Sequence, residues 1–167
     1  MIGKTSILRN LQRLEALYSS AHSPMKTLFY AKLSILELGG WIEESMDSVI
    51  RSCANRNLKD GRNRHVIEED IIKRTYGFAY DQHFRKMLVQ VVGLAGVEKL
   101  EKRVDPVKLH MMKGALGSLK TSRDTEAHSH LKGVTRRLDA PSVTRARFFD
   151  VYDGLREVES TLRKLTL

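Results

Sequence analysis

Two side chains in the last third of the chain are suited to phosphodiester chemistry. Arg123 and His128 are separated by four residues within the stretch 119–131. A guanidinium stays charged and matches the oxygens of a phosphate, whereas an imidazole gains and loses a proton near neutral pH. The pair could therefore hold a phosphate and transfer a proton beside it.

The spacing alone does not single out this pair. Three Arg–His pairs with four to six intervening residues occur, and roughly 1.7 are expected by chance from this composition. The pair Arg103 and His110 is interrupted by Asp105-Pro106, which predicts a helix start and puts the two side chains on different elements. The other two pairs share Arg123, which is paired with His128 or with His130. The structural setting expected for these residues therefore has to show whether they form a functional motif.

That setting is the end of a helix followed by a basic segment. An apolar pattern with the spacing of one helix face precedes the motif: Val107, Met111, Ala115, Leu116 and Leu119. Five cations follow it, with Asp139 as the one carboxylate among them: Lys132, Arg136, Arg137, Arg145 and Arg147. The motif is therefore expected at a partly accessible helix end, with these five cations as candidate RNA-binding residues.

Composition favours one basic, helical domain. The 167 residues fit a single domain, 1–167, and 41% of them are hydrophobic, with three prolines and few β-branched runs. The formal net charge of +9 comes from 29 basic and 20 acidic side chains. A polyanion such as RNA, DNA or an acidic protein is the partner that this charge favours.

Cysteine usage and hydropathy indicate a cytoplasmic protein that does not span a membrane. Cys53 is the only cysteine, which excludes an internal disulfide and fits a reducing compartment. Its place on an apolar helix stripe predicts a buried, inert thiol. No stretch approaches the roughly 18 apolar residues of a membrane span, and no cleavable signal is visible. Residues 1–18 are basic and amphipathic like an organellar presequence, but a first core helix is the simpler interpretation.

A long second helix dominates the predicted fold. After a first helix, Ser23-Pro24 predicts a new start, and the pattern continues to about Asn57. One continuous apolar stripe runs along it: Leu28, Ile35, Leu38, Ile42, Met46, Val49 and Cys53. Gly39-Gly40 interrupts this stripe, so either the helix bends there or another backbone packs closely against it; we favour close packing.

A second face of this helix carries Glu37, Trp41 and Glu44. A carboxylate on a partly buried face needs a partner, and the arginine of the motif is one candidate. Exposure of these carboxylates to solvent is the alternative, since polar residues are mostly exposed. Glu44 is therefore an auxiliary candidate for the site.

The rest of the chain predicts further helices. The polar stretch 55–65 predicts a loop, and a short helix is expected around 67–72. A buried helix or helix pair is expected over 84–100, broken at Gly93 or Gly96, and Pro141-Ser142 opens the last helix. No convincing period-two alternation occurs. The expected fold is an all-α, single-domain bundle of five or six helices.

These residues resemble the HEPN superfamily, in which an arginine and a histidine four to six residues later stand at a helix end in an α-bundle. The match here is Arg123-Asp124-Thr125-Glu126-Ala127-His128, and the stretch 30–44 resembles the long second helix of the RiboL-PSP branch. The resemblance covers about residues 5–165. It implies a metal-independent endoribonuclease, often a toxin or phage-defence effector, that dimerises with its two motifs facing each other. It also implies an antitoxin or defence-system protein as a possible partner, and some members are inactive scaffolds.

The chemistry of RNA fits this resemblance. Attack of a 2′-hydroxyl on the adjacent phosphate needs a base, an acid for the leaving 5′-oxygen and positive charge on the phosphorane. His128 is the predicted base or acid, and Arg123 would hold the phosphate. A second imidazole could come from a second copy of the chain or, as an auxiliary group, from His130. Asp124 would orient one of the motif side chains or cap the following turn.

No metal and no cofactor are expected. Zinc normally takes at least three protein ligands, and the His-Ser-His run offers two. Two non-catalytic alternatives stay open. One is a helical module that binds RNA or an acidic protein, with Arg123 paired to a carboxylate such as Glu44 and with His128 buried. The other is an antitoxin or assembly subunit that docks onto an acidic neighbour.

Overall fold

The computed structural model describes residues 2–127 and 138–165. Over these residues the chain forms six α-helices and two π-helical turns without a β-strand, which confirms the all-α bundle. The elements are α1 (Thr5–Ser19), α2 (Pro24–Asn57), α3 (Gly61–Val66), η1 (Ile67–Ile72), η2 (Tyr80–Phe84), α4 (Arg85–Arg103), α5 (Pro106–Ala127) and α6 (Pro141–Lys164).

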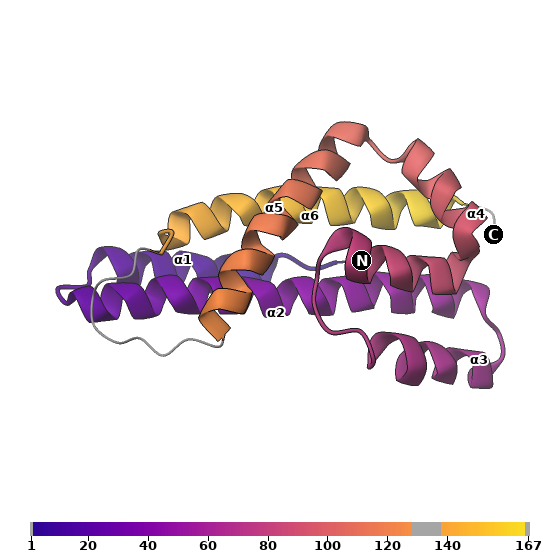
Figure 1. The fold of residues 1–167 in the computed structure, drawn as a ribbon, viewed down its shortest axis with the longest axis horizontal. Coiled ribbons are helices and arrows are strands. Elements are labelled where there is room, and N and C mark those ends of the chain that lie inside the picture. The colour runs from indigo at the N-terminus through magenta and orange to yellow at the C-terminus, as the bar shows by residue number, and fades with distance from the viewer. Residues whose placement is uncertain (1, 128–137, 166–167) are drawn as a thin grey trace.

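Three helices run along the long axis of the molecule, and one crosses them (Figure 1). Helices α1, α2 and α6 follow the long axis, and α5 passes obliquely across them. Helices α3 and α4 gather at the end that holds the C-terminus. The end of α5, where the motif begins, therefore lies over the middle of α2.

Helix α2 contributes a continuous stripe of buried side chains to the hydrophobic core, as its sequence predicts. Pro24 occupies the first turn, where its missing N–H costs nothing, and the helix continues for 34 residues to Asn57. All seven residues of the predicted apolar stripe are buried. Cys53 is one of them, at 2% exposure, and burial raises the pKa of its thiol, so the predicted inert cysteine is confirmed.

Aspartate caps set the starts of two other helices. Asp105 Oδ1 accepts from the Val107 amide at 2.8 Å, and α5 begins at Pro106, as the sequence predicts. Asp60 Oδ1 accepts from the Arg62 amide at 2.8 Å and caps α3. The expected loop over 55–65 is therefore wrong in part, because α2 still covers 55–57 and the Asp60 cap starts a helix at 61.

A glycine breaks α4, and another lets α5 approach α6. Gly93 has φ 73° and ψ 167°, a conformation that side chains disfavour, so the predicted break falls at this residue. A β-carbon on Gly154 of α6 would lie 2.4 Å from Met112 Cβ of α5. The absence of a side chain at Gly154 thus lets these two helices cross closely.

Candidate functional site

Arg123 lies at the seam between α5, α2 and the loop before η2. A β-carbon on Gly39 of α2 would come within 3.3 Å of Arg123 Cγ and 3.4 Å of the Phe78 ring. The guanidinium carbon lies 5.2 Å from the centroid of that ring. Close packing is therefore present at Gly39 but not at Gly40, and the groups that pack there are the side chains of the motif arginine and a phenylalanine rather than the expected backbone.

Carboxylates orient the guanidinium of Arg123. Its Nη2 donates to Glu43 Oε1 of α2, and its Nη1 lies 3.6 Å from Asp124 Oδ1. The Asp124 carboxylate also accepts from Lys120 Nζ at 2.7 Å. The Arg123 side chain is 25% exposed and that of Glu43 is 38% exposed, so a solvent-borne ligand can still reach this group.

His83 is a second imidazole near this seam. Its Nδ1 accepts from the Ala79 amide at 3.1 Å, so the neutral ring carries its proton on Nε2. Burial, followed by the charge of Lys120, lowers the pKa of His83, and the charge of Glu43 acts on it in the opposite direction. Because Nδ1 accepts this hydrogen bond, the neutral ring of His83 offers an N–H donor at Nε2.

A glycine fixes the place of this imidazole. Gly77 has φ 112°, and a β-carbon there would lie 2.9 Å from His83 Cε1. The next residue, Phe78, is fully buried and packs against Arg123. The loop 77–79 thus positions both the arginine and the imidazole.

Acidic residues surround the α2 side of the seam. Burial raises the pKa of Asp47 from 3.8 to about 6, and the charges of Glu43 and Glu68 add to this increase while Arg51 opposes it. Arg51 itself donates from Nε to Glu68 Oε2 at 2.9 Å. Asp47 is therefore held in a place where its negative charge is unfavourable.

Asp47→Asn is expected to raise the free energy of unfolding by about 1 kcal/mol near pH 7.5, after allowance for solvent screening of a half-buried group. The folded chain keeps the Asp47 proton up to about pH 6, whereas the unfolded chain loses it near 3.8. Ionisation therefore lowers stability as the pH rises between these values, and the loss is complete above them. Urea unfolding across this pH range measures the effect.

Asp153→Asn, the same change at an exposed position of α6, is the control for this prediction. The gain from Asp47→Asn should disappear below about pH 4, because both states then hold the proton. A gain of equal size at about pH 4 and at about pH 7.5 would contradict the assignment.

The other predicted motif residues divide into two groups. Asp124 lies beside Arg123 on α5, as its sequence position requires. The remaining residues fall outside the described part of the chain: His128, His130, Lys132, Arg136 and Arg137. The seam described above is therefore the described part of the predicted site, and it contains Arg123 and Asp124.

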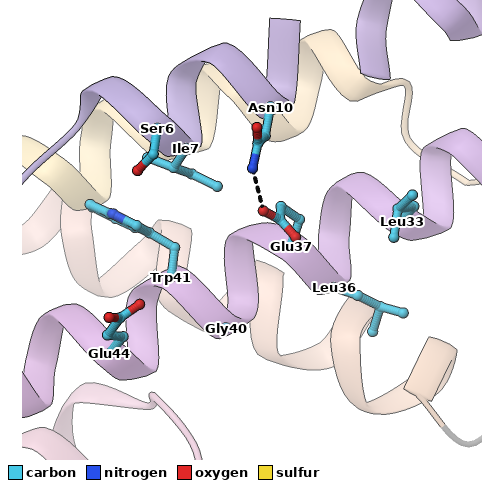
Figure 2. A pocket seen from close by; sticks show the side chains of 9 residues that line it. All are labelled: Ser6, Ile7, Asn10, Leu33, Leu36, Glu37, Gly40, Trp41 and Glu44. Carbon is cyan, nitrogen blue, oxygen red and sulfur yellow. Dashed lines mark hydrogen bonds between the residues drawn. The ribbon is translucent and has the colours of Figure 1, made fainter. Parts of the chain in front are cut away.

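The predicted second face of α2 lines a groove against α1 (Figure 2). Glu37, Trp41 and Glu44 all line it, and its volume is about 390 Å³. Glu37 accepts from Asn10 Nδ2 of α1 at 2.7 Å, drawn as the dashed line in Figure 2. The carboxylate that meets Arg123 is Glu43, one residue before the expected Glu44, because Glu44 is turned to this groove instead.

Two cations of the predicted basic segment are engaged by carboxylates. Arg145 Nε lies 2.8 Å from Glu15 Oε2 of α1, and Arg147 Nη1 lies 2.8 Å from Asp139 Oδ2. Glu15 is therefore a second carboxylate that contacts the basic segment, besides Asp139. It lies far from this segment in the sequence, so the local sequence does not predict the contact. These contacts hold the first turns of α6 to α1 and to the segment before it.

The sequence reasoning missed Glu43, Phe78 and His83. Glu43 precedes Glu44 in the same helix, and only the rotation of α2 within the bundle distinguishes the two. Phe78 and His83 are about 40 residues from Arg123 in the chain, and no local spacing connects them to it. The glycine at position 77 is the one sequence signal of an unusual turn there.

No protein-family model matches the chain, and no curated protein or solved structure is significantly similar to it. None of the described helices combines the length and apolar character needed to cross a membrane. Within residues 2–127 and 138–165, no three His, Cys, Asp or Glu side chains gather in a way that could hold a metal ion. The seam around Arg123 is therefore the feature from which a function can be inferred.

Proposed function

We propose that the chain is a metal-independent endoribonuclease that holds the reacting phosphate at Arg123. The observation that carries this proposal is the Arg123 side chain, which is one-quarter exposed and whose guanidinium is contacted by Glu43 and by the Phe78 ring. An arginine fixed in this way can bind a phosphate without first losing much side-chain freedom. It precedes His128 by five positions, and that imidazole is the proposed proton carrier.

In the proposed reaction the 2′-hydroxyl of RNA attacks the adjacent phosphorus, and the bond to the 5′-oxygen breaks. His128 removes the hydroxyl proton or protonates the leaving oxygen. The other step uses His130 or the His128 of a second copy of the chain. Arg123 neutralises the charge that develops on the phosphorane. His83 donates from Nε2 to a phosphate oxygen and is not a base in this scheme.

Incubation of the purified protein with single-stranded RNA in EDTA tests this function. Cleavage is expected to leave a 2′,3′-cyclic phosphate, and a single 2′-O-methyl substitution should protect the bond next to it. An RNA that stays intact in EDTA, or cleavage at the 2′-O-methylated position, would rule out the proposed chemistry.

The same proposal includes a biological role as a toxin or phage-defence effector in the cytoplasm, restrained by an antitoxin or another defence protein. It rests on the HEPN resemblance of the motif 123–128. Induced expression in bacteria should arrest growth, and His128→Ala should relieve the arrest. Unchanged growth with the intact motif, at an expression level equal to that of the variant, counts against this role.

We also propose a second function, a non-catalytic helical module that binds RNA or an acidic protein. The observation in its favour is that the described cations of the motif and the basic segment contact carboxylates. Arg123 meets Glu43, Arg145 meets Glu15, and Arg147 meets Asp139. In this role the motif arginine joins α5 to α2 and takes no part in chemistry.

Thermal and urea unfolding separate the two functions. In the structural role, Arg123→Ala and Glu43→Ala should each lower the free energy of unfolding by about 2 kcal/mol, because each leaves a partly buried charge without its partner. Asp153→Ala, at an exposed carboxylate of α6, is the control and should change it by less than about 0.5 kcal/mol. Losses below about 0.5 kcal/mol for all three variants would exclude the structural role.

A further inference from the structure

Helix α2 carries a second apolar stripe, on the side opposite the core. Its members follow at spacings of four, three and four residues: Phe29, Leu33, Leu36 and Gly40. Phe29 is 52% exposed and Leu33 is 48% exposed, although both are large and apolar. This spacing is that of a helix–helix seam, so α2 presents to solvent the pattern by which helices pack on one another.

A recess lies next to this stripe. The groove of about 390 Å³ between α1 and α2 is lined by Leu33, Leu36 and Gly40, and Figure 2 shows these residues along α2. A β-carbon on Gly40 would have no neighbouring heavy atom within 4 Å. The groove therefore has room for a side chain from outside at Gly40.

Charge along residues 24–50 of α2 is divided between a basic half, 24–36, and an acidic half, 37–50, and Arg51 and Arg56 follow in the last turns of the helix. From Pro24 to Leu36 the helix contains two lysines, Lys26 and Lys32, and no carboxylate. From residue 37 to residue 50 it contains four carboxylates and no lysine or arginine: Glu37, Glu43, Glu44 and Asp47. A second α2 running antiparallel would bring its basic half to the acidic half of the first.

We propose that α2 is the interface of a homodimer in which the α2 helices of the two copies pack antiparallel about a two-fold axis. In one register Phe29 of each copy lies opposite Gly40 of the other, where the groove receives it. The same register places Leu33 opposite Leu36. A two-fold interface needs such a self-complementary pattern, because each contact occurs twice.

The charges fit the same register. Lys26 and Glu44 are 18 residues apart, which is about five turns, so they project from the same side of α2. In an antiparallel pair, the same sides of the two helices meet. Lys26 of each copy therefore comes next to Glu44 of the other, and both side chains are exposed in the single chain.

This charge pattern also argues against RNA as the ligand of this face. Glu37 and Glu44 line the groove, and a phosphate backbone would be repelled by them. The interface rests on α2 alone and stands whether or not the chain cleaves RNA. Binding of an unrelated protein or of RNA to this face of a monomeric chain is an outcome that overturns it.

Sedimentation equilibrium of the full chain tests the interface. The wild type is expected to reach twice the 19.1 kDa of one chain, and Leu33→Gln should weaken association by about tenfold or more. Leu94→Gln is the matched control, because Leu94 is 68% exposed and lies on α4. A wild type that stays monomeric, or a dimer that Leu33→Gln and Leu94→Gln affect equally, overturns the proposal.

A charge exchange tests the register without apolar substitutions. Lys26→Glu and Glu44→Lys should each weaken self-association, because each variant places like charges opposite one another. An equimolar mixture of the two variants should associate again, since every pair in the mixed dimer joins opposite charges. The mixture also shows that both variants are folded. A mixture that associates no better than the separate variants excludes this register.

Discussion

His128→Ala is expected to slow cleavage of single-stranded RNA in EDTA by about 10²- to 10⁴-fold, the usual contribution of a positioned proton carrier. Alanine removes the one group of the motif that can change its protonation near neutral pH. The free energy of unfolding should stay within about 0.5 kcal/mol of the wild type, as for other substitutions that leave the core intact. Initial rates with an end-labelled RNA measure the loss.

His110→Ala provides the matched control for this experiment. His110 lies on α5, is exposed and belongs to the Arg–His pair that the helix start at Pro106 separates. Its replacement should leave the cleavage rate unchanged. Equal rates for the wild type and His128→Ala would remove the imidazole from the mechanism and contradict the proposed chemistry.

Arg123→Lys extends the same test to the phosphate-binding group. Lysine keeps the positive charge but lacks the planar pair of N–H donors that matches a phosphate. The cleavage rate should therefore fall by about tenfold or more even though the charge is preserved. The contact with Glu43 responds to charge, so stability should fall less than in Arg123→Ala.

Gly154→Ala is expected to lower the free energy of unfolding by about 1 to 3 kcal/mol, the usual range for overpacking of a tight core. The added β-carbon would lie 2.4 Å from Met112 Cβ, a distance that real β-carbons do not reach. The contact is with the first carbon of the side chain, so rotation of Met112 cannot relieve it. Helix α5 would have to move away from α6. Urea unfolding at one pH measures the difference.

The same substitution at Gly114 separates this effect from helix propensity. Gly114 is inside α5, and a β-carbon there has no neighbour within 4 Å. Gly114→Ala should therefore stabilise the fold by up to about 1 kcal/mol, because alanine favours a helix more than glycine does. Opposite signs for the two variants are expected, and equal signs would show that the crossing at Gly154 tolerates a side chain.

Much of the fold could be predicted because its signals are local. The start of α2 at Ser23-Pro24 and its buried stripe follow from proline chemistry and from a repeat of 3.6 residues. The prediction of a loop over 55–65 is wrong in part, because a single side chain starts a helix at residue 61. Polar composition indicates a loop, but the Asp60 carboxylate caps a helical turn at 61.

The site could be predicted only in part, because its contacts join segments that are far apart in the chain. The motif arginine and the need for a carboxylate on α2 follow from residue type and charge. Glu43 and Glu44 are separated by a rotation of about 100° around the helix axis, and no sequence pattern locates a helix face to that precision. The sequence therefore does not show which of the two carboxylates contacts Arg123. The turn at Gly77 places His83 near the seam, because its glycine leaves room for the His83 ring. The periodicity of the local sequence does not predict this packing.

The break of α4 at Gly93 has a consequence for local unfolding. The stretches 85–92 and 94–103 do not share one continuous ladder of backbone hydrogen bonds, because the glycine between them leaves the helical conformation. An opening that begins in one stretch therefore has no ladder along which to spread to the other. We therefore expect the amide protons on the two sides of Gly93 to exchange with solvent at separate rates, which is the behaviour of two cooperative units rather than one.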